Sequence, residues 1–104
     1  MTLKEKQKKV DDWMSQFTEG YWSPHEIICR LSEETGELAR EINHRFGPKK
    51  KKDSEDVAEV GDEISDIIFT LICLANSLDI DLEESFEKMM EKYQVRDGNR
   101  WKKK

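Results

Sequence analysis

The chain has 104 residues, of which 36% are hydrophobic and 39% are charged, and its formal net charge is -5. A domain of this size buries only a small core. A chain this polar therefore needs either very polar outer faces or apolar surface that is buried against another subunit. We expect the second. The acidic balance argues against a nucleic-acid polymer as the partner, because phosphate backbones attract surfaces rich in Lys and Arg.

No apolar segment approaches the roughly 20 residues of a membrane span. The N-terminal sequence MTLKEKQKKVDDW is highly charged and lacks the apolar stretch of a secretory signal. We therefore expect a cytoplasmic protein that does not contact a membrane. Cys29 and Cys73 have no neighbours at metal-binding spacing and are expected to be reduced residues within helices.

Helical periodicity, with Gly and Pro at the edges of the periodic segments, predicts an all-α, four-helix fold in a single domain over residues 1–104. The first helix is expected over about 3–17, within an N-terminal segment 1–20. The second begins sharply, because Ser23, Pro24 and Glu26 combine an N-cap, a proline at the first helical position and a capping-box glutamate. It is expected to end near Arg45.

The second half of the chain is also expected to be helical. After a charged loop at 49–53, Ser54 is a plausible cap for a third helix that reaches about Leu78. Asp81, with a glutamate three residues later, opens a fourth helix, and residues 97–104 are expected to form a flexible tail.

Two glycines lie inside the predicted second and third helices, where each costs roughly 1 kcal/mol relative to Ala. They are Gly36 and Gly61. Either a close approach of the two helices or a need for room beside an acidic site would explain them.

Acidic pairs at i, i+3 spacing occur on both central helices. At about 100° per residue, Glu34 and Glu37 lie beside one flank of the apolar stripe of the second helix. Glu63 and Asp66 lie beside the same flank of the stripe of the third helix. The stripes consist of Ile27, Leu31, Leu38 and Ile42 on one helix, and of Val60, Ile67, Leu71, Leu74 and Leu78 on the other. Packing these stripes together would bring the four carboxylates toward one another.

Four converging carboxylates repel one another unless some are protonated or a cation is bound. Ligands that offer only oxygen suit Mg²⁺, Mn²⁺ or Ca²⁺, whereas Zn²⁺ more often recruits His or Cys. The alternative is that these acidic pairs simply face solvent, as i, i+3 charges on helices commonly do. The pattern is thus compatible with a metal site and with a solvated surface.

Residues 33–38, EETGEL, and 61–66, GDEISD, resemble the EExxE and ExxD motifs of MazG-like nucleotide pyrophosphohydrolases. The resemblance covers about 22–96. It implies an all-α fold whose subunits assemble as a homodimer or homotetramer, with Mg²⁺, or Mn²⁺ as a substitute, held by Glu34, Glu37, Glu63 and Asp66. It also implies hydrolysis of a (deoxy)nucleoside triphosphate to a monophosphate and pyrophosphate, with Glu33 orienting a ligand or helping to position water.

Lys92 and Arg96 resemble the downstream basic motif of the same family, which implies contact with substrate phosphates. Composition alone favours a solvated stripe paired with nearby glutamates. Trp22 and His25 are candidates for contact with the nucleobase. Trp13 lies near them in the sequence, but core packing is its simpler interpretation.

Two alternative functions stay open. The chain could be a non-catalytic, metal-stabilised helical binding protein that engages a partner through Ile67–Ala75, which is apolar almost all round. It also resembles phosphoribosyl-ATP pyrophosphohydrolases, which join acidic helical motifs to diphosphate cleavage. The sequence does not indicate which base or sugar is preferred.

Overall fold

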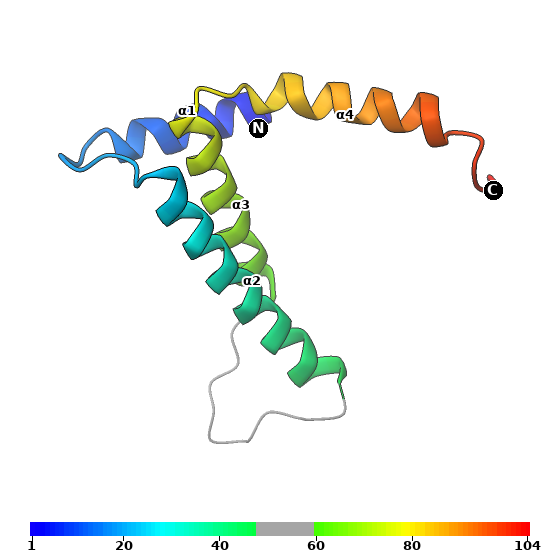
Figure 1. The fold of residues 1–104 in the computed structure, drawn as a ribbon, viewed down its shortest axis with the longest axis horizontal. Coiled ribbons are helices and arrows are strands. Elements are labelled where there is room, and N and C mark those ends of the chain that lie inside the picture. Colours follow the sequence, from blue (N-terminus) through cyan, green and yellow to red (C-terminus); the bar gives the residue numbers. More distant parts are fainter. Residues whose placement is uncertain (48–59) are drawn as a thin grey trace.

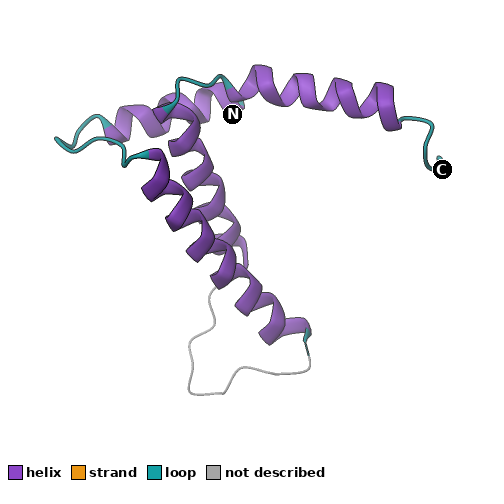
Figure 2. Ribbon diagram, viewed as in Figure 1, coloured by secondary structure: helices purple, strands orange, loops and turns teal. Residues whose placement is uncertain are grey.

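A computed structural model describes residues 1–47 and 60–104, and these residues form four helices and no strand. The helices are α1 (Leu3–Met14), α2 (Pro24–Phe46), α3 (Val60–Ser77) and α4 (Leu82–Asp97), as Figure 2 shows. The prediction of an all-α, four-helix fold is confirmed. The expected loop at 49–53 and the cap at Ser54 lie outside the described residues.

The helix starts follow the capping residues in the sequence. Ser23 caps α2 by accepting a hydrogen bond from the backbone N–H of Glu26 at 3.4 Å, and the Glu26 carboxylate accepts the N–H of Ser23 in return. Asp81 caps α4 by accepting the N–H of Glu84 at 3.2 Å. Each cap satisfies an amide that has no partner inside its helix.

The first helix is shorter than predicted, because it ends at Met14 rather than near Phe17. Turn-type hydrogen bonds replace the helical pattern, as in the bond from the N–H of Phe17 to the carbonyl of Met14 at 3.1 Å. Gly20 then has φ 64°, a left-handed conformation that favours glycine. The chain therefore leaves α1 early and turns back into α2.

The helices α2 and α3 form an antiparallel pair, and α1 lies across one end of α3 (Figure 1). The α4 helix contacts α1 and projects away from the α2–α3 pair (Figure 1). The radius of gyration of 17.5 Å exceeds the roughly 13 Å of a compact domain of this length. One chain alone is therefore an open arrangement of helices.

The contact between α2 and α3 differs from the predicted packing of apolar stripes. The α2 residues buried along it are Ile27, Glu34 and Glu41, spaced by seven residues and thus aligned along the helix. On α3, Glu63 and Thr70 have the same spacing and are also buried. Of the four carboxylates expected at the flank of this contact, Glu34 and Glu63 lie inside it, whereas Glu37 and Asp66 stay exposed.

Three of the nine residues of the expected apolar stripes consequently stay exposed. Ile42 is 39% exposed, and on α3 Leu71 and Leu78 are 41% and 49% exposed. Gly36 and Gly61 do not mark a close approach of α2 and α3, because a Cβ at either position would meet no atom within 4 Å among the described residues. No helix of the described segments is long and apolar enough to cross a membrane.

Candidate metal centre and adjoining pocket

Three carboxylates meet between α2 and α3. Glu34, Glu37 and Glu63 each offer one oxygen, and these three oxygens lie within 4.8 Å of one another. Glu34 and Glu37 are separated by nearly one helical turn, so both reach the same part of α3. The structure thus brings together three of the four residues predicted to hold a metal.

The buried members of this cluster have unsatisfied oxygens. Glu34 is 1% exposed and Glu63 is 9% exposed. The Oε2 atoms of both have no hydrogen-bond partner among the described residues. Leaving a buried charged oxygen without a partner is costly, so both oxygens need a ligand.

Burial raises the pKa of Glu34, an effect that the Arg30 guanidinium opposes and that the charges of Glu37 and Asp66 reinforce. Burial is also the largest cause that raises the pKa of Glu63, and the negative charges of Glu37, Glu34 and Asp66 raise it further. Both shifts mean that the ionised cluster lacks sufficient positive charge.

Asp66, the fourth predicted ligand, lies next to this cluster. It shares the lining of the neighbouring pocket with Glu34, and its charge acts on both Glu34 and Glu63. An oxygen-only donor set with two orphaned, buried oxygens fits a hard divalent cation such as Mg²⁺ or Mn²⁺. Glu34, Glu37, Glu63 and Asp66 are the residues that would hold it.

Arg30 supplies the positive charge nearest to the cluster. Its guanidinium forms an ion pair with Glu34, one turn further along α2, and another with Glu33 at 3.2 Å. Glu33 therefore turns toward Arg30 and solvent, while Glu34 turns into the contact with α3. The double glutamate of the EExxE motif is split between two environments.

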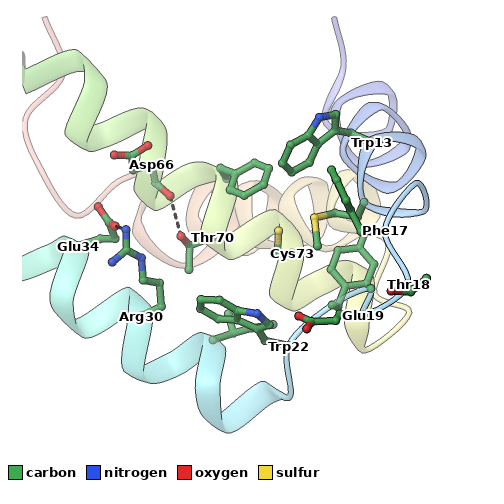
Figure 3. Close-up of a pocket in the computed structure, with 15 residues that line it drawn as sticks. Trp13, Phe17, Thr18, Glu19, Trp22, Arg30, Glu34, Asp66, Thr70 and Cys73 are labelled. Carbon is green, nitrogen blue, oxygen red and sulfur yellow. Dashed lines mark hydrogen bonds and ion pairs between the residues drawn. The ribbon is translucent and has the colours of Figure 1, made fainter.

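An aromatic pocket of about 620 Å³ opens beside the cluster. Figure 3 shows Trp13 and Phe17 across from Trp22, with Cys73 between them and Glu34, Arg30 and Asp66 toward the other end. Trp13 contacts Phe17 and Phe69 edge to face, with ring centroids 5.1 and 6.1 Å apart. The pocket thus joins apolar aromatic walls to a charged end.

The candidates for contact with the base lie in different places. Trp22 lines this aromatic pocket, but His25 lines a second hollow of about 350 Å³ together with Trp22, Arg30 and Glu33. Trp13 is 51% exposed, so the expectation that it packs in the core is wrong. The reason is that α1 packs on α3 and α4, which leaves the end of α1 overhanging the pocket.

The predicted phosphate-binding residues do not reach the cluster within one chain. Lys92 and Arg96 belong to the part of α4 that projects away from α2 and α3 (Figure 1). Arg96 pairs instead with Asp97 at 2.8 Å and lies over the ring of Tyr93. Their contact with a substrate stays a prediction that a single chain does not satisfy.

Sequence reasoning missed several residues of the pocket. Phe17 lies in the turn after α1 and Phe69 lies on α3, and only the crossing of α1 over α3 brings them together. Arg30 could have been identified from its i, i+4 spacing to Glu34, which is the usual geometry of a helical ion pair.

The acidic cluster, its oxygen-only donors and the antiparallel helical pair define an all-α protein with a candidate divalent-metal centre. The sequence model of the family described as "MazG nucleotide pyrophosphohydrolase domain" matches residues 22–101. The chain belongs to the MazG nucleotide pyrophosphohydrolase family. The family assignment and the pyrophosphohydrolase class predicted from the two acidic motifs are therefore confirmed.

The chain is 52% identical to the Bacillus subtilis (strain 168) protein YpjD over 103 residues, which cover 99% of this chain and 93% of that protein. The crystal structure of Bacillus subtilis YpjD superposes with a TM-score of 0.80 at 53% identity, covering 89% of this chain and 95% of the other. A Bacillus-conserved MazG protein, a nucleotide pyrophosphohydrolase, superposes with a TM-score of 0.79 at 44% identity, covering 93% and 94% of the two chains.

Proposed function

We propose that this protein is a Mg²⁺-dependent hydrolase that cleaves a nucleoside or deoxynucleoside triphosphate to a monophosphate and pyrophosphate. The observation that carries this proposal is the cluster of Glu34, Glu37 and Glu63, whose oxygens lie within 4.8 Å of one another. Two of these residues have buried oxygens without a partner among the described residues. Membership of the pyrophosphohydrolase family supports the reaction class.

A divalent ion bound by these carboxylates would neutralise charge on the phosphates and make a water molecule more nucleophilic. The water attacks the α-phosphorus, the bond from this phosphorus to the bridging oxygen breaks, and pyrophosphate leaves. The proton of this water would leave to solvent on the open side of the cluster, where the exposed Glu37 lies. Arg30, between the cluster and the pocket, is placed to meet a phosphate.

The aromatic pocket is the proposed site for the nucleobase. Its walls include Trp13, Phe17 and Trp22, and one end of the pocket reaches Glu34 and Asp66. Bases stack on aromatic side chains, so a base between these walls would leave its phosphates directed toward the carboxylates. His25 lies in the adjoining hollow and would contact the sugar or an outer part of the substrate.

We further propose a homodimer or homotetramer as the active form. Apolar side chains on α3 stay exposed, with Ile64 at 44%, Ile68 at 46% and Leu71 at 41%. Lys92 and Arg96 lie on a helix that points away from its own cluster (Figure 1). A second copy would cover the apolar surface and bring positive charge toward the acidic site.

Pyrophosphate release should be measured from a panel of ordinary and modified nucleoside triphosphates, with phosphoribosyl-ATP included, in the presence and absence of Mg²⁺. We expect release that requires Mg²⁺ from at least one triphosphate. Glu37→Gln and Asp66→Asn should each lower kcat/KM by a factor on the order of 100 or more, because charge stabilisation at the phosphates is lost.

Asp12→Asn on α1 is the matched control, since it removes one exposed carboxylate that pairs with Lys8 outside the cluster and should leave turnover unchanged. Helicity measured by circular dichroism should be the same in all variants. Full turnover by both cluster variants would remove the proposed metal site. Absence of release from every substrate at high enzyme concentration would favour a non-catalytic binding protein.

A further inference from the structure

Asn76, in the last turns of α3, joins three segments of the chain through its side-chain amide. Its Nδ2 donates to the backbone carbonyl of Gln7 at 3.0 Å and to the hydroxyl of Tyr21 at 2.9 Å. Its Oδ1 accepts a hydrogen bond from Nε2 of Gln7 at 2.8 Å. Both donors and the acceptor are thus used, and α3 is tied to α1 and to the turn before α2.

The two partners of Asn76 extend the network further. Nε2 of Gln7 also donates to the carbonyl of Ile80 at 2.8 Å, and its Oε1 accepts the N–H of Leu82 at 2.9 Å. The Tyr21 hydroxyl donates to Asp11 on α1 at 2.7 Å. Burial, and to a smaller extent the hydrogen bond to Asp11, raises the pKa of Tyr21 to about 12. The hydroxyl therefore keeps its proton at neutral pH.

This network adjoins the aromatic pocket through Tyr21. Tyr21 belongs to the pocket lining, and so does Trp13, two residues after Asp11 on α1. On α3, Cys73 and Phe69 line the pocket about one and two turns before Asn76. The three segments that Asn76 connects are therefore the three that carry the pocket walls opposite α2.

Within one chain, packing alone holds these walls weakly. Trp13, Phe17 and Trp22 are 51%, 52% and 52% exposed, so each has large parts of its surface without protein neighbours. Hydrogen bonds are directional, and a network in which every group is satisfied selects one arrangement of the segments that it joins. The spacing between the walls accordingly depends on this network.

We propose that Asn76 is a positioning residue that acts through Gln7 and Tyr21 to set the spacing of the aromatic walls, and thereby the choice of nucleobase. This inference rests on the proposed function, because it takes the pocket to hold a base. Stacking by itself tolerates every base, since each has an aromatic face. Discrimination between one-ring and two-ring bases must then come from the width of the pocket, which Asn76 and Tyr21 fix.

The test uses Tyr21→Phe, which keeps the ring in the pocket and removes the hydroxyl, and Asn76→Asp, which keeps the size and removes both donors. Binding of purine and pyrimidine nucleoside monophosphates is followed by quenching of Trp13 and Trp22 fluorescence, in a Trp101→Phe background. Tyr93→Phe is the matched control, because it removes the other phenolic hydroxyl at an exposed position of α4.

We expect the wild type and Tyr93→Phe to have the same ratio of dissociation constants between the two base classes. Tyr21→Phe and Asn76→Asp should reduce this ratio by about tenfold, which is the order of discrimination that an apolar pocket achieves through its size. In turnover assays the change should fall on KM, with kcat and the Mg²⁺ requirement retained, because Glu34, Glu37, Glu63 and Asp66 do not take part in the network.

A merely structural role would lower thermal stability and weaken the binding of every base equally, and that result would overturn the proposal. An unchanged ratio in both variants, or a wild type that binds both base classes equally, would also overturn it. Fluorescence does not require hydrolysis. Base-selective binding without any pyrophosphate release would therefore reject the proposed function and retain the positioning role of Asn76.

Discussion

Glu34 combines deep burial with an incomplete set of partners. It is 1% exposed, it pairs with Arg30 through one oxygen, and its other oxygen has no partner among the described residues. A buried charge in this state opposes folding unless further positive charge arrives. The metal centre is thus a place where stability and function compete.

Without metal, the protein should lose thermal stability as the pH rises above 4.5 and passes through the raised pKa values of Glu34 and Glu63. The pKa values of Glu34 and Glu63 are raised from 4.5 in the folded chain, mainly by burial. Between pH 4.5 and the raised values, the folded state holds more protons than the unfolded state. This stabilisation is complete below the unfolded pKa and is lost as the pH passes the folded pKa.

Melting in a chelator, followed by circular dichroism across this pH range, checks the expectation. Mg²⁺ at 100 times its Kd should restore about 2.7 kcal/mol at the upper end of the range. Glu34→Gln should flatten the pH profile and weaken the response to Mg²⁺, whereas Asp12→Asn should do neither. A wild-type melting temperature that rises with pH without metal would contradict the assignment of these two carboxylates.

The residues of the acidic cluster could be identified from the sequence, but their environment could not. Spacing at i, i+3 placed Glu34 and Glu37 on one face, and the motif pairing indicated a metal. Periodicity also placed Glu34 at the edge of an apolar stripe, whereas the structure places it in the contact itself. Helical phase gives the relative angle of two side chains, but the angle at which a neighbouring helix packs is not encoded locally.

The start of α2 is fixed by the capping residues of its first turn. Ser23 and Glu26 form a reciprocal capping box, and the same turn carries His25 and follows Trp22. The cap therefore fixes the start of α2 and the position at which the preceding turn, which lines the aromatic pocket, joins the helix. Local stability and pocket geometry are linked at this position.

Ser23→Ala should lower the free energy of unfolding by about 1 kcal/mol, because the N–H of Glu26 loses its acceptor. Chemical denaturation measures this change directly. Ser32→Ala is the matched control, since its hydroxyl bonds to the carbonyl of Ile28 within the same helix and caps nothing. An equal cost for the two substitutions would show that the cap has no special contribution.

For the whole molecule, the open arrangement of helices is the main feature to explain. Ile64, Ile68 and Leu71 lie at helical spacing on α3, and each is at least 41% exposed. The α4 helix leaves the body of the chain and carries further exposed apolar side chains, Phe86 and Met90 among them. Surfaces of this kind on several helices are typical of an interface between subunits.

Ile68→Asp should convert the proposed homo-oligomer into a monomer and lower turnover, because a charge would enter the apolar contact between copies. Light scattering coupled to size-exclusion chromatography gives the mass of each species. Trp101→Asp, in the C-terminal tail outside α2 and α3, is the control and should leave the mass unchanged. A wild-type monomer at micromolar concentration would refute the shared interface.

By itself, the sequence determined the four helices, the caps of α2 and α4, and the acidic residues of the candidate metal centre, because capping and spacing are local properties of the chain. Only the tertiary structure decided that α1 crosses α3, that Trp13 and Phe17 form walls of a pocket, and that Asn76 connects these walls. These features depend on contacts between residues far apart in sequence, such as Gln7 and Asn76. Helical periodicity contains no information about which distant helix such a residue will meet.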